Sequence, residues 1–143
     1  MMTIKNNLPS KISCVVTRSG EPVEGLMLVA IFEVERKNAY SIVFGPTNSF
    51  GVAEITKDCI LSDANKQLEF SMMDYAPLEE CFTGGISVSF MNANEIKTAL
   101  EAYSRFCKYY SYPANYEKNL KLSLEAVIKI EDVKIQIDTQ FVK

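Results

Sequence analysis

Hydrophobic and polar residues alternate along much of the chain, with the period of half-buried β-strands. One run, residues 26–34, is apolar on both faces over part of its length, which is typical of a strand covered on both sides. Short runs of this kind, bounded by Gly, Pro, Asn or charged residues, predict strands at 12–17, 26–34, 39–44, 52–56 and 86–90. The intervening segments 18–22 and 45–51 combine glycine and proline, so they predict tight turns.

Alternation continues in the C-terminal part of the chain. Residues 120–124, 126–130 and 133–137 predict strands, the last two forming one hairpin or one strand bent about Glu131-Asp132. Residues 67–75 are ambiguous. Their apolar and polar positions alternate and favour a strand that ends before Pro77, with a short helix as the alternative.

Between residues 92 and 111 the hydrophobic period changes from two to three and four. Asn92 and Glu95 have the spacing of a capping box, in which each side chain binds the other residue's backbone N–H. One amphipathic helix is therefore predicted over about 92–111. The residues of its apolar face are Ile96, Ala99, Leu100, Tyr103, Phe106, Cys107 and Tyr110.

Seven or eight short strands and one long helix predict a mainly β protein. Because the strands follow one another without alternating helices, an antiparallel β-sandwich is favoured over βαβ units. The long helix would cover one sheet or an open end of the sandwich. The chain shows no internal repeat and no linker, so residues 1–143 are predicted to form a single domain with an inserted helix.

Two turn motifs in the N-terminal half resemble those of a known protein superfamily. The first is Gly20-Glu21-Pro22-Val23-Glu24-Gly25, and the second is Gly45-Pro46-Thr47-Asn48-Ser49-Phe50-Gly51. Together with the strands around them, over residues 12–56, they resemble the transthyretin-like, carboxypeptidase-regulatory-like β-sandwich superfamily. The resemblance implies a strand, a tight turn, a long strand, a return strand and a second tight turn before the next strand.

The same resemblance bears on activity. The enzymatic branch of that superfamily, hydroxyisourate hydrolase, uses histidines and a C-terminal Tyr-Arg-Gly-Ser. This chain has no histidine and ends Thr139-Gln140-Phe141-Val142-Lys143. The resemblance therefore points to a non-catalytic branch.

Composition narrows the chemistry further. Without histidine, Ser-His-Asp catalysis, Cys-His catalysis and histidine metal sites are excluded. A net charge of −3 argues against non-specific nucleic-acid binding, and no apolar run is long enough to span a membrane. The four cysteines form no CxxC pair, and no secretory segment precedes Cys14. We therefore expect a cytoplasmic protein with reduced thiols.

Two groups of reactive side chains are considered as sites. Glu79-Glu80, with Asp74 nearby, could do acid–base work or bind Ca²⁺, but the pattern fits a solvated acidic loop better. Cys81 is expected to be the most exposed thiol, yet a buried structural cysteine is the commoner case. The sequence thus predicts no catalytic residue, no metal site, no cofactor and no enzyme.

An aromatic cluster, residues 103–116, is the feature that suggests binding. Tyrosine beside arginine is favoured at protein interfaces. The alternative is that the rings pack over an edge of the sandwich with their hydroxyls in water. The predicted protein-contact residues are Arg105, Lys108, Tyr109, Tyr112 and Tyr116.

The leading hypothesis is a non-catalytic β-sandwich module that binds another protein, as an accessory subunit or an immunity-type partner. Self-association through an edge strand is a second form of the same hypothesis. The alternative is a small-molecule or glycan-binding domain with a concave site lined by Tyr109, Tyr112 or Tyr116. An enzyme that uses carboxylates or a thiol is the third hypothesis. Nucleic acid and membrane are not expected as partners.

Overall fold

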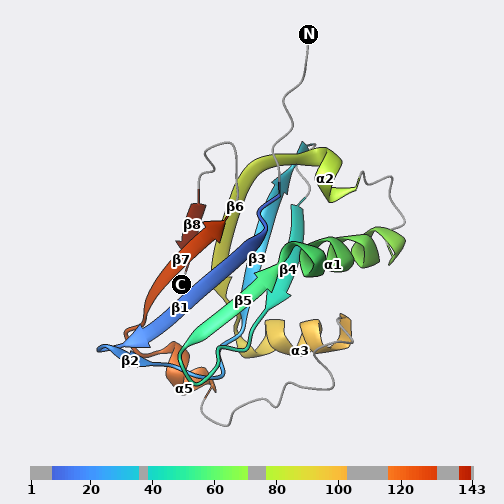
Figure 1. Ribbon diagram of the computed structural model, residues 1–143. Helices are drawn as coiled ribbons and strands as arrows, with labels where there is room; N and C mark the ends of the chain where they lie inside the picture. The colour runs from blue at the N-terminus through green and yellow to red at the C-terminus, as the bar shows by residue number, and fades with distance from the viewer. Residues whose placement is uncertain (1–7, 36–38, 71–76, 103–115, 132–138, 143) are drawn as a thin grey trace.

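The structure is a computed structural model that describes residues 8–35, 39–70, 77–102, 116–131 and 139–142. It is mainly β, with two sheets and several short helices (Figure 1). The elements are β1 (Lys11–Arg18), β2 (Glu21–Pro22), β3 (Leu28–Val34), β4 (Ala39–Phe44), β5 (Val52–Thr56), α1 (Lys57–Phe70), α2 (Leu78–Cys81), β6 (Phe82–Phe90), α3 (Ala93–Ala102), α5 (Tyr116–Leu120), β7 (Glu125–Glu131) and β8 (Thr139–Val142).

The first sheet is built around β1, which has neighbours on both sides. β7 pairs with residues 11–17 along one side, and β5 pairs with residues 11–15 along the other. The two-residue strand β2 continues the β5 side after the turn at Gly20. All these pairings are antiparallel, and β7 lies at one edge of the sheet.

The second sheet has the order β4-β3-β6-β8. Its first three strands are antiparallel, as predicted, but β8 runs parallel to β6. The sheet is therefore mixed. A parallel neighbour needs a long connection, and in this chain β8 follows β6 only after α3, α5 and β7.

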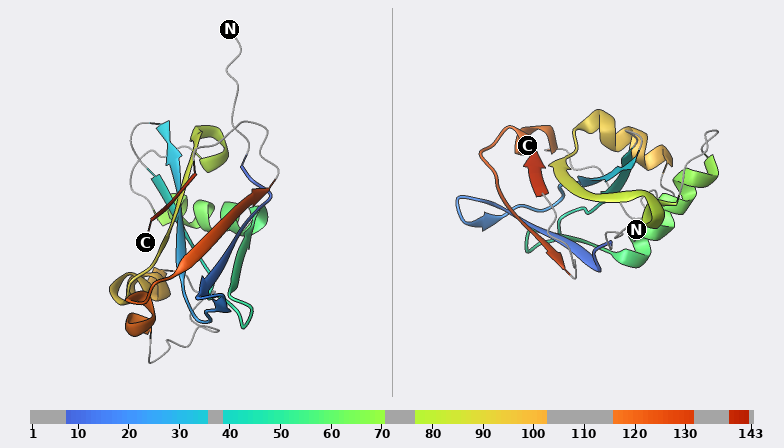
Figure 2. Two further views of the ribbon diagram at one scale, coloured as in Figure 1. Left: turned by 90° about the vertical axis from the view of Figure 1, so that its left-hand side faces the viewer. Right: turned by 90° about the horizontal axis from the view of Figure 1, so that it is seen from above.

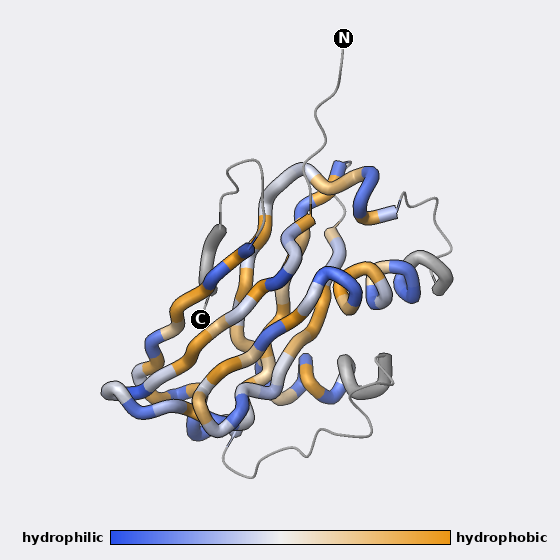
Figure 3. The backbone as a smooth tube through the Cα atoms, viewed as in Figure 1, coloured by the Kyte–Doolittle hydropathy of each residue, from blue (hydrophilic) through white to orange (hydrophobic). Residues whose placement is uncertain are grey.

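The two sheets lie face to face on a shared core (Figure 2). Alternate residues of β1, namely Ile12, Cys14 and Val16, are completely buried. In β3, Phe32 packs edge-to-face on Phe82 of β6, with ring centroids 5.8 Å apart. Figure 3 shows hydrophobic and hydrophilic residues alternating along β1, β5 and β7 of the first sheet. The expectation of a mainly β chain arranged in layers is confirmed.

The two predicted turn motifs contact each other through Thr47, which is almost fully buried. The Leu26 N–H donates to Thr47 Oγ1 at 3.0 Å, and this hydroxyl donates to the Val23 carbonyl at 2.7 Å. Backbone bonds add to the link, because the Gly25 N–H donates to Thr47 and the Thr47 N–H donates to Leu26. The turns between β2 and β3 and between β4 and β5 therefore form one hydrogen-bonded unit.

Helix α1 corrects the prediction for residues 67–75. Residues 67–70 belong to this helix rather than to a strand, so the alternative of a helix is right over that part; 71–75 lie outside the described residues. The alternation of apolar and polar residues over 67–75 favours a strand, but buried residues earlier in α1 fix 67–70 as part of a helix. Ile60 and Ala64, four residues apart, are both buried, as the helical period requires.

Helix α3 confirms the predicted start of the long helix. The Glu95 N–H donates to Asn92 Oδ1 at 2.8 Å, and the Asn92 N–H donates to Glu95 Oε1 at 3.2 Å, which completes the capping box. The helix is described from Ala93 to Ala102. The remainder of the predicted helix, to residue 111, falls in the segment 103–115 outside the described residues.

The strand predicted at residues 120–124 is wrong. Leu120 ends helix α5, and a turn follows in which the Lys121 and Leu122 N–H groups donate back to Lys118 and Asn119. The strand predicted at 126–130 is confirmed as β7, whereas 133–137 lie outside the described residues.

Candidate interaction surface

The outer face of the first sheet, which points away from the core, carries three cross-strand rows. In Figure 1 it is turned toward the viewer, and no helix of the described chain crosses it. The register aligns one residue from each of β7, β1 and β5 in every row. These rows are Val127–Val15–Val52, Lys129–Ser13–Glu54 and Glu131–Lys11–Thr56.

The first of these rows, which we call the valine row, is apolar and accessible. Val127 is 69% exposed and Val15 is 39% exposed, while Val52 is half-buried. Phe50, two residues before Val52, is 75% exposed. Single exposed apolar residues are ordinary, but a cross-strand row continued by an aromatic ring is a feature of interaction sites.

Phe50 is held in the turn before β5 by the side chain of Asn48. Asn48 Oδ1 accepts hydrogen bonds from the N–H groups of Phe50 at 2.9 Å and Val52 at 3.1 Å. Gly51 follows with φ 76°, and a Cβ atom there would lie 2.4 Å from the Val16 carbonyl oxygen. Only glycine fits this position. The exposed ring is therefore displayed on a rigid turn.

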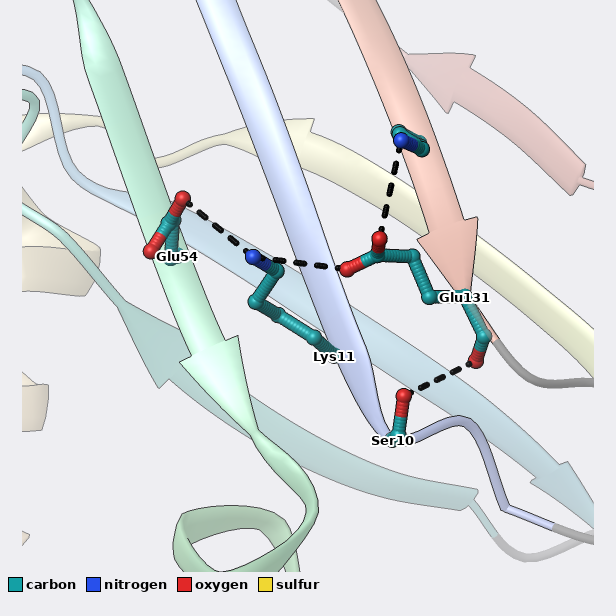
Figure 4. Close-up of polar contacts among 5 residues, drawn as sticks. Ser10, Lys11, Glu54 and Glu131 are labelled. Atoms are coloured by element: carbon teal, nitrogen blue, oxygen red, sulfur yellow. Dashed lines mark hydrogen bonds and ion pairs between the residues drawn. The ribbon is translucent and has the colours of Figure 1, made fainter.

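An ionic cluster lies beside the valine row and joins all three strands (Figure 4). Lys11 Nζ of β1 lies 3.7 Å from Glu54 Oε1 of β5 and 3.4 Å from Glu131 Oε2 of β7. Lys129 Nζ lies 3.5 Å from Glu131 Oε1. The hydrogen bond with Glu131 and the charges of both carboxylates raise the pKa of Lys11 above its ordinary value. The outer face thus combines an apolar strip with fixed charges.

The predicted contact residues are placed differently from this face. Tyr116, expected to contribute to an interaction surface, is completely buried. Its hydroxyl donates to the Met91 carbonyl and accepts the Met27 N–H at 3.3 Å. The prediction that Tyr116 is a contact residue is therefore wrong. The alternative, in which the Tyr116 hydroxyl lies in water, is wrong as well. The other four residues, Arg105, Lys108, Tyr109 and Tyr112, lie outside the described residues.

The described thiols and carboxylates that were considered for chemistry differ in their exposure to solvent. Cys81, expected to be the most exposed thiol, is 7% exposed, which corrects that prediction. Burial raises the pKa of Cys81 and raises that of Cys14 to about 11, so both thiols stay protonated at neutral pH. Glu79 and Glu80 are exposed in the first turn of α2. Asp74 lies outside the described residues.

No disulfide joins the three described cysteines, Cys14, Cys59 and Cys81. Within the described ranges, no group of three or more Cys, Asp or Glu side chains is placed to hold a metal ion.

A pocket of about 310 Å³ lies between the end of β6, the start of α3 and the segment before β7. Its apolar wall is formed by Phe90 and three leucines, and its polar groups are Asn92 and Glu95. Both polar side chains already form the capping box of α3. The pocket therefore offers mainly apolar contact to a ligand.

No known protein family, curated protein or solved structure matches this chain. Across the part of the chain that the structure describes, none of the helices has both the length and the apolar character needed to cross a membrane.

The outer face was missed by sequence reasoning, although part of its signal was visible. Val15, Val52 and Val127 alternate with the inward-facing residues Cys14, Ala53 and Ile128 of their strands, so they occupy the positions where the pattern predicts solvent exposure. What the sequence did not show was that β1 pairs with both β5 and β7, which places the three valines side by side.

Proposed function

We propose that this protein is a non-catalytic β-sandwich module that binds another protein through the outer face of its first sheet. The observation that carries the proposal is the valine row, bordered by the ionic cluster, together with the exposed ring of Phe50 two residues before Val52. An apolar centre with a charged rim is the usual anatomy of a protein interface.

The shape of this surface favours a protein over a small molecule. The valine row runs across three strands of an open sheet, and Phe50 lines the same hollow as Val52 of that row. An exposed aromatic side chain on a rigid turn loses little freedom on binding, which is why aromatic anchors dominate interface energetics. Lys11, Glu54 and Glu131 are held in place before a partner arrives.

The helix residues remain part of the proposal as a second contact region. Arg105, Lys108, Tyr109 and Tyr112 follow α3 in the sequence and combine tyrosine with basic side chains. An accessory subunit or an immunity-type partner acting in the cytoplasm would use such a surface without any chemistry of its own.

We further propose that the sandwich is of the transthyretin-like kind. The support is local. The Gly20–Gly25 and Gly45–Gly51 motifs form the turns at the places that the resemblance implies, and Thr47 joins them by hydrogen bonds. The absence of histidine separates the chain from the enzymatic branch of that superfamily.

The pocket beside α3 supports the alternative of a small-molecule or glycan-binding domain. A volume of about 310 Å³ is within the range of ligand sites. Titration of intrinsic tyrosine fluorescence with a panel of glycans and apolar metabolites tests it. A saturable response that is lost in Leu122→Asp supports this alternative, and flat responses remove it.

Affinity capture from the native host tests the leading proposal. The bait is the full chain, and the decisive variant is Phe50→Asp, which replaces the exposed ring with a charge. Ser49→Asp, one residue away in the same exposed turn, is the matched control because it adds the same charge and keeps the ring. We expect specific partners to be retained by the control and depleted at least about tenfold by Phe50→Asp.

Circular dichroism of each bait establishes that the fold is retained. A partner that is captured equally by Phe50→Asp would show that the outer face is not the binding surface. Failure of the wild-type chain to capture any partner would count against a protein-binding role.

A further inference from the structure

We propose that two copies of this chain pair through β7, edge to edge and antiparallel about a two-fold axis at Val127. The two first sheets then become one continuous sheet of order β5-β1-β7-β7′-β1′-β5′, where a prime marks the second copy. This inference goes beyond the proposed function, because the pairing uses the edge of the sheet and leaves Phe50 exposed.

β7 is the longest edge strand in the described chain, and it is well suited to pairing. It has seven residues, contains neither proline nor glycine, and is rich in β-branched side chains. Among the described strands only β1 pairs with it. On the opposite side of the molecule, α1 contacts both β4 and β5, and Gln67 of α1 donates to the Ser41 carbonyl of β4 at 2.9 Å.

The hydrogen bonds that β1 makes to its neighbours show which backbone groups of β7 face away from the sheet. The Val16 N–H donates to Gly51 on the β5 side, so even-numbered residues of β1 bond toward β5. Odd-numbered residues of β1 therefore bond toward β7, where they meet odd-numbered partners such as Val127. It follows that the N–H and C=O groups of Ala126, Ile128 and Ile130 point away from β1.

The hydrophobic core is only partly covered along the β7 edge of the first sheet. The inward residues of β1 are completely buried, whereas those of β7, namely Ala126, Ile128 and Ile130, are only half-buried. Their aliphatic side chains sit against the core but keep contact with water. A second β7 strand alongside would cover them, and removing apolar surface from water favours association.

Charge selects the register of this pairing. With the axis at Val127, each Glu125 faces Lys129 of the other copy, Val127 faces Val127, and Ala126 faces Ile128. The two charged pairs are of opposite sign and stand at closely spaced, non-hydrogen-bonded positions of the ladder. Lys129 is 74% exposed, so its ammonium group is free to reach across while Glu131 stays nearby.

One of the two neighbouring registers, with the axis at Ile128, is disfavoured by the same rule. An axis at Ile128 would place each Glu125 opposite Glu131 of the other copy, and like charges directly opposite each other destabilise a sheet. It would also place Val127 against Lys129 in place of a valine. The Val127 axis joins the two valine rows into one strip.

Sedimentation equilibrium of the full chain over a range of concentrations tests the pairing. We expect the wild type to reach twice the 16.1 kDa mass of the chain. Glu125→Lys places lysine against lysine twice, and Lys129→Glu places glutamate against glutamate twice, so each should raise the dimer dissociation constant about tenfold or more. The double variant Glu125→Lys/Lys129→Glu restores opposite charges and should recover the dimer.

Glu79→Lys is the matched control, because it makes the same charge change at an exposed position in α2. It should leave the dissociation constant unchanged. The sign of the Glu125→Lys effect also tests the register, since pairing about Ile128 would place the new lysine against Glu131 and strengthen the dimer. A monomeric wild type in the millimolar range, or a dimer indifferent to all three β7 variants, overturns the proposal.

Cross-linking locates the axis independently of charge. Val127→Cys places two thiols at a non-hydrogen-bonded pair, where the Cα atoms stand about 4.5 Å apart, within the range for a disulfide. Mild oxidation should give a covalent dimer. The wild type and Val15→Cys, on the same face one strand away, should give none. Equal cross-linking of all three proteins, or none in Val127→Cys, overturns the axis.

Discussion

Tyr116 holds two distant parts of the chain together through one hydroxyl group. It lies in α5 and is completely buried, yet its partners are Met91, directly after β6, and Met27, directly before β3. Its ring fills the core while the hydroxyl satisfies backbone groups that are out of reach of water. Buried polar groups are stabilising only when they are paired in this way.

We expect Tyr116→Phe to lower the free energy of unfolding by about 1–3 kcal/mol, because it leaves the Met27 N–H without this acceptor. Urea denaturation of the full chain measures the loss. Phe50→Ala, which truncates an exposed ring, should change the stability by less than about 0.5 kcal/mol. Equal stability of Tyr116→Phe and wild type would show that the hydrogen bonds contribute nothing.

Burial of the Cys14 thiol affects the stability of the protein at alkaline pH. Desolvation raises the pKa of its thiol to about 11, above the value of about 8.5 for an exposed cysteine. Between these values the unfolded chain loses the proton while the native chain keeps it. The contribution of the protonated Cys14 thiol to the free energy of unfolding is therefore complete below about pH 8.5. It declines as the pH rises, by up to about 1.4 kcal/mol per pH unit.

We accordingly expect the stability of the wild type to fall more steeply above about pH 9 than that of Cys14→Ala, whatever the two values are at neutral pH. Urea midpoints collected across the alkaline range measure the slopes. Cys59→Ala, at a half-buried cysteine in α1, serves as the control. Identical slopes for wild type and Cys14→Ala would contradict the role assigned to burial of this thiol.

At the level of elements, α3 is the case in which local sequence was sufficient. The Asn92 and Glu95 side chains bind backbone groups only three residues away, so the start of the helix depends on nothing distant. In contrast, the end of α1 and the turn after α5 were assigned to strands. There, alternation over a few residues competed with helices anchored elsewhere, at Ile60 and at Tyr116.

We expect Asn92→Ala to lower the free energy of unfolding by about 1 kcal/mol, since the first turn of α3 loses its cap. Asn92→Ser should retain most of the stability because serine is also a good N-cap. Asn94→Ala, two residues into the same helix and exposed, should be close to neutral. Thermal and urea denaturation distinguish these variants, and a neutral Asn92→Ala would mean that the cap is dispensable.

At the scale of the whole molecule, the two sheets determine which apolar residues remain outside. Val15, Val52 and Val127 come from three strands that are far apart in the sequence, and only their pairing makes them one surface. The same pairing leaves β7 at an edge and its inward aliphatic residues half-buried. The proposed binding face and the proposed dimer thus both originate in strand order.

Association adds to stability by mass action, so we expect the melting temperature of the wild type to rise with protein concentration. Glu125→Lys should weaken this dependence, whereas Phe50→Asp should keep it, because Phe50 lies outside the paired edges. Scanning calorimetry over a hundredfold range of concentration measures the effect. A melting temperature independent of concentration in the wild type would speak against a dimer of native chains.

The sequence by itself determined the presence of β1, β3, β4, β5, β6 and β7, although β3 begins at Leu28 instead of Leu26 and β6 begins at Phe82 instead of Ile86. It also determined the capped start of α3 and the tight turns at Gly20–Gly25 and Gly45–Gly51. Each of these depends on side-chain period or on hydrogen bonds within a few residues. Only the tertiary structure decided the burial of Tyr116 and Cys81, the parallel place of β8 and the alignment of the valine row. These features depend on contacts between residues far apart in the chain, which a local pattern does not encode.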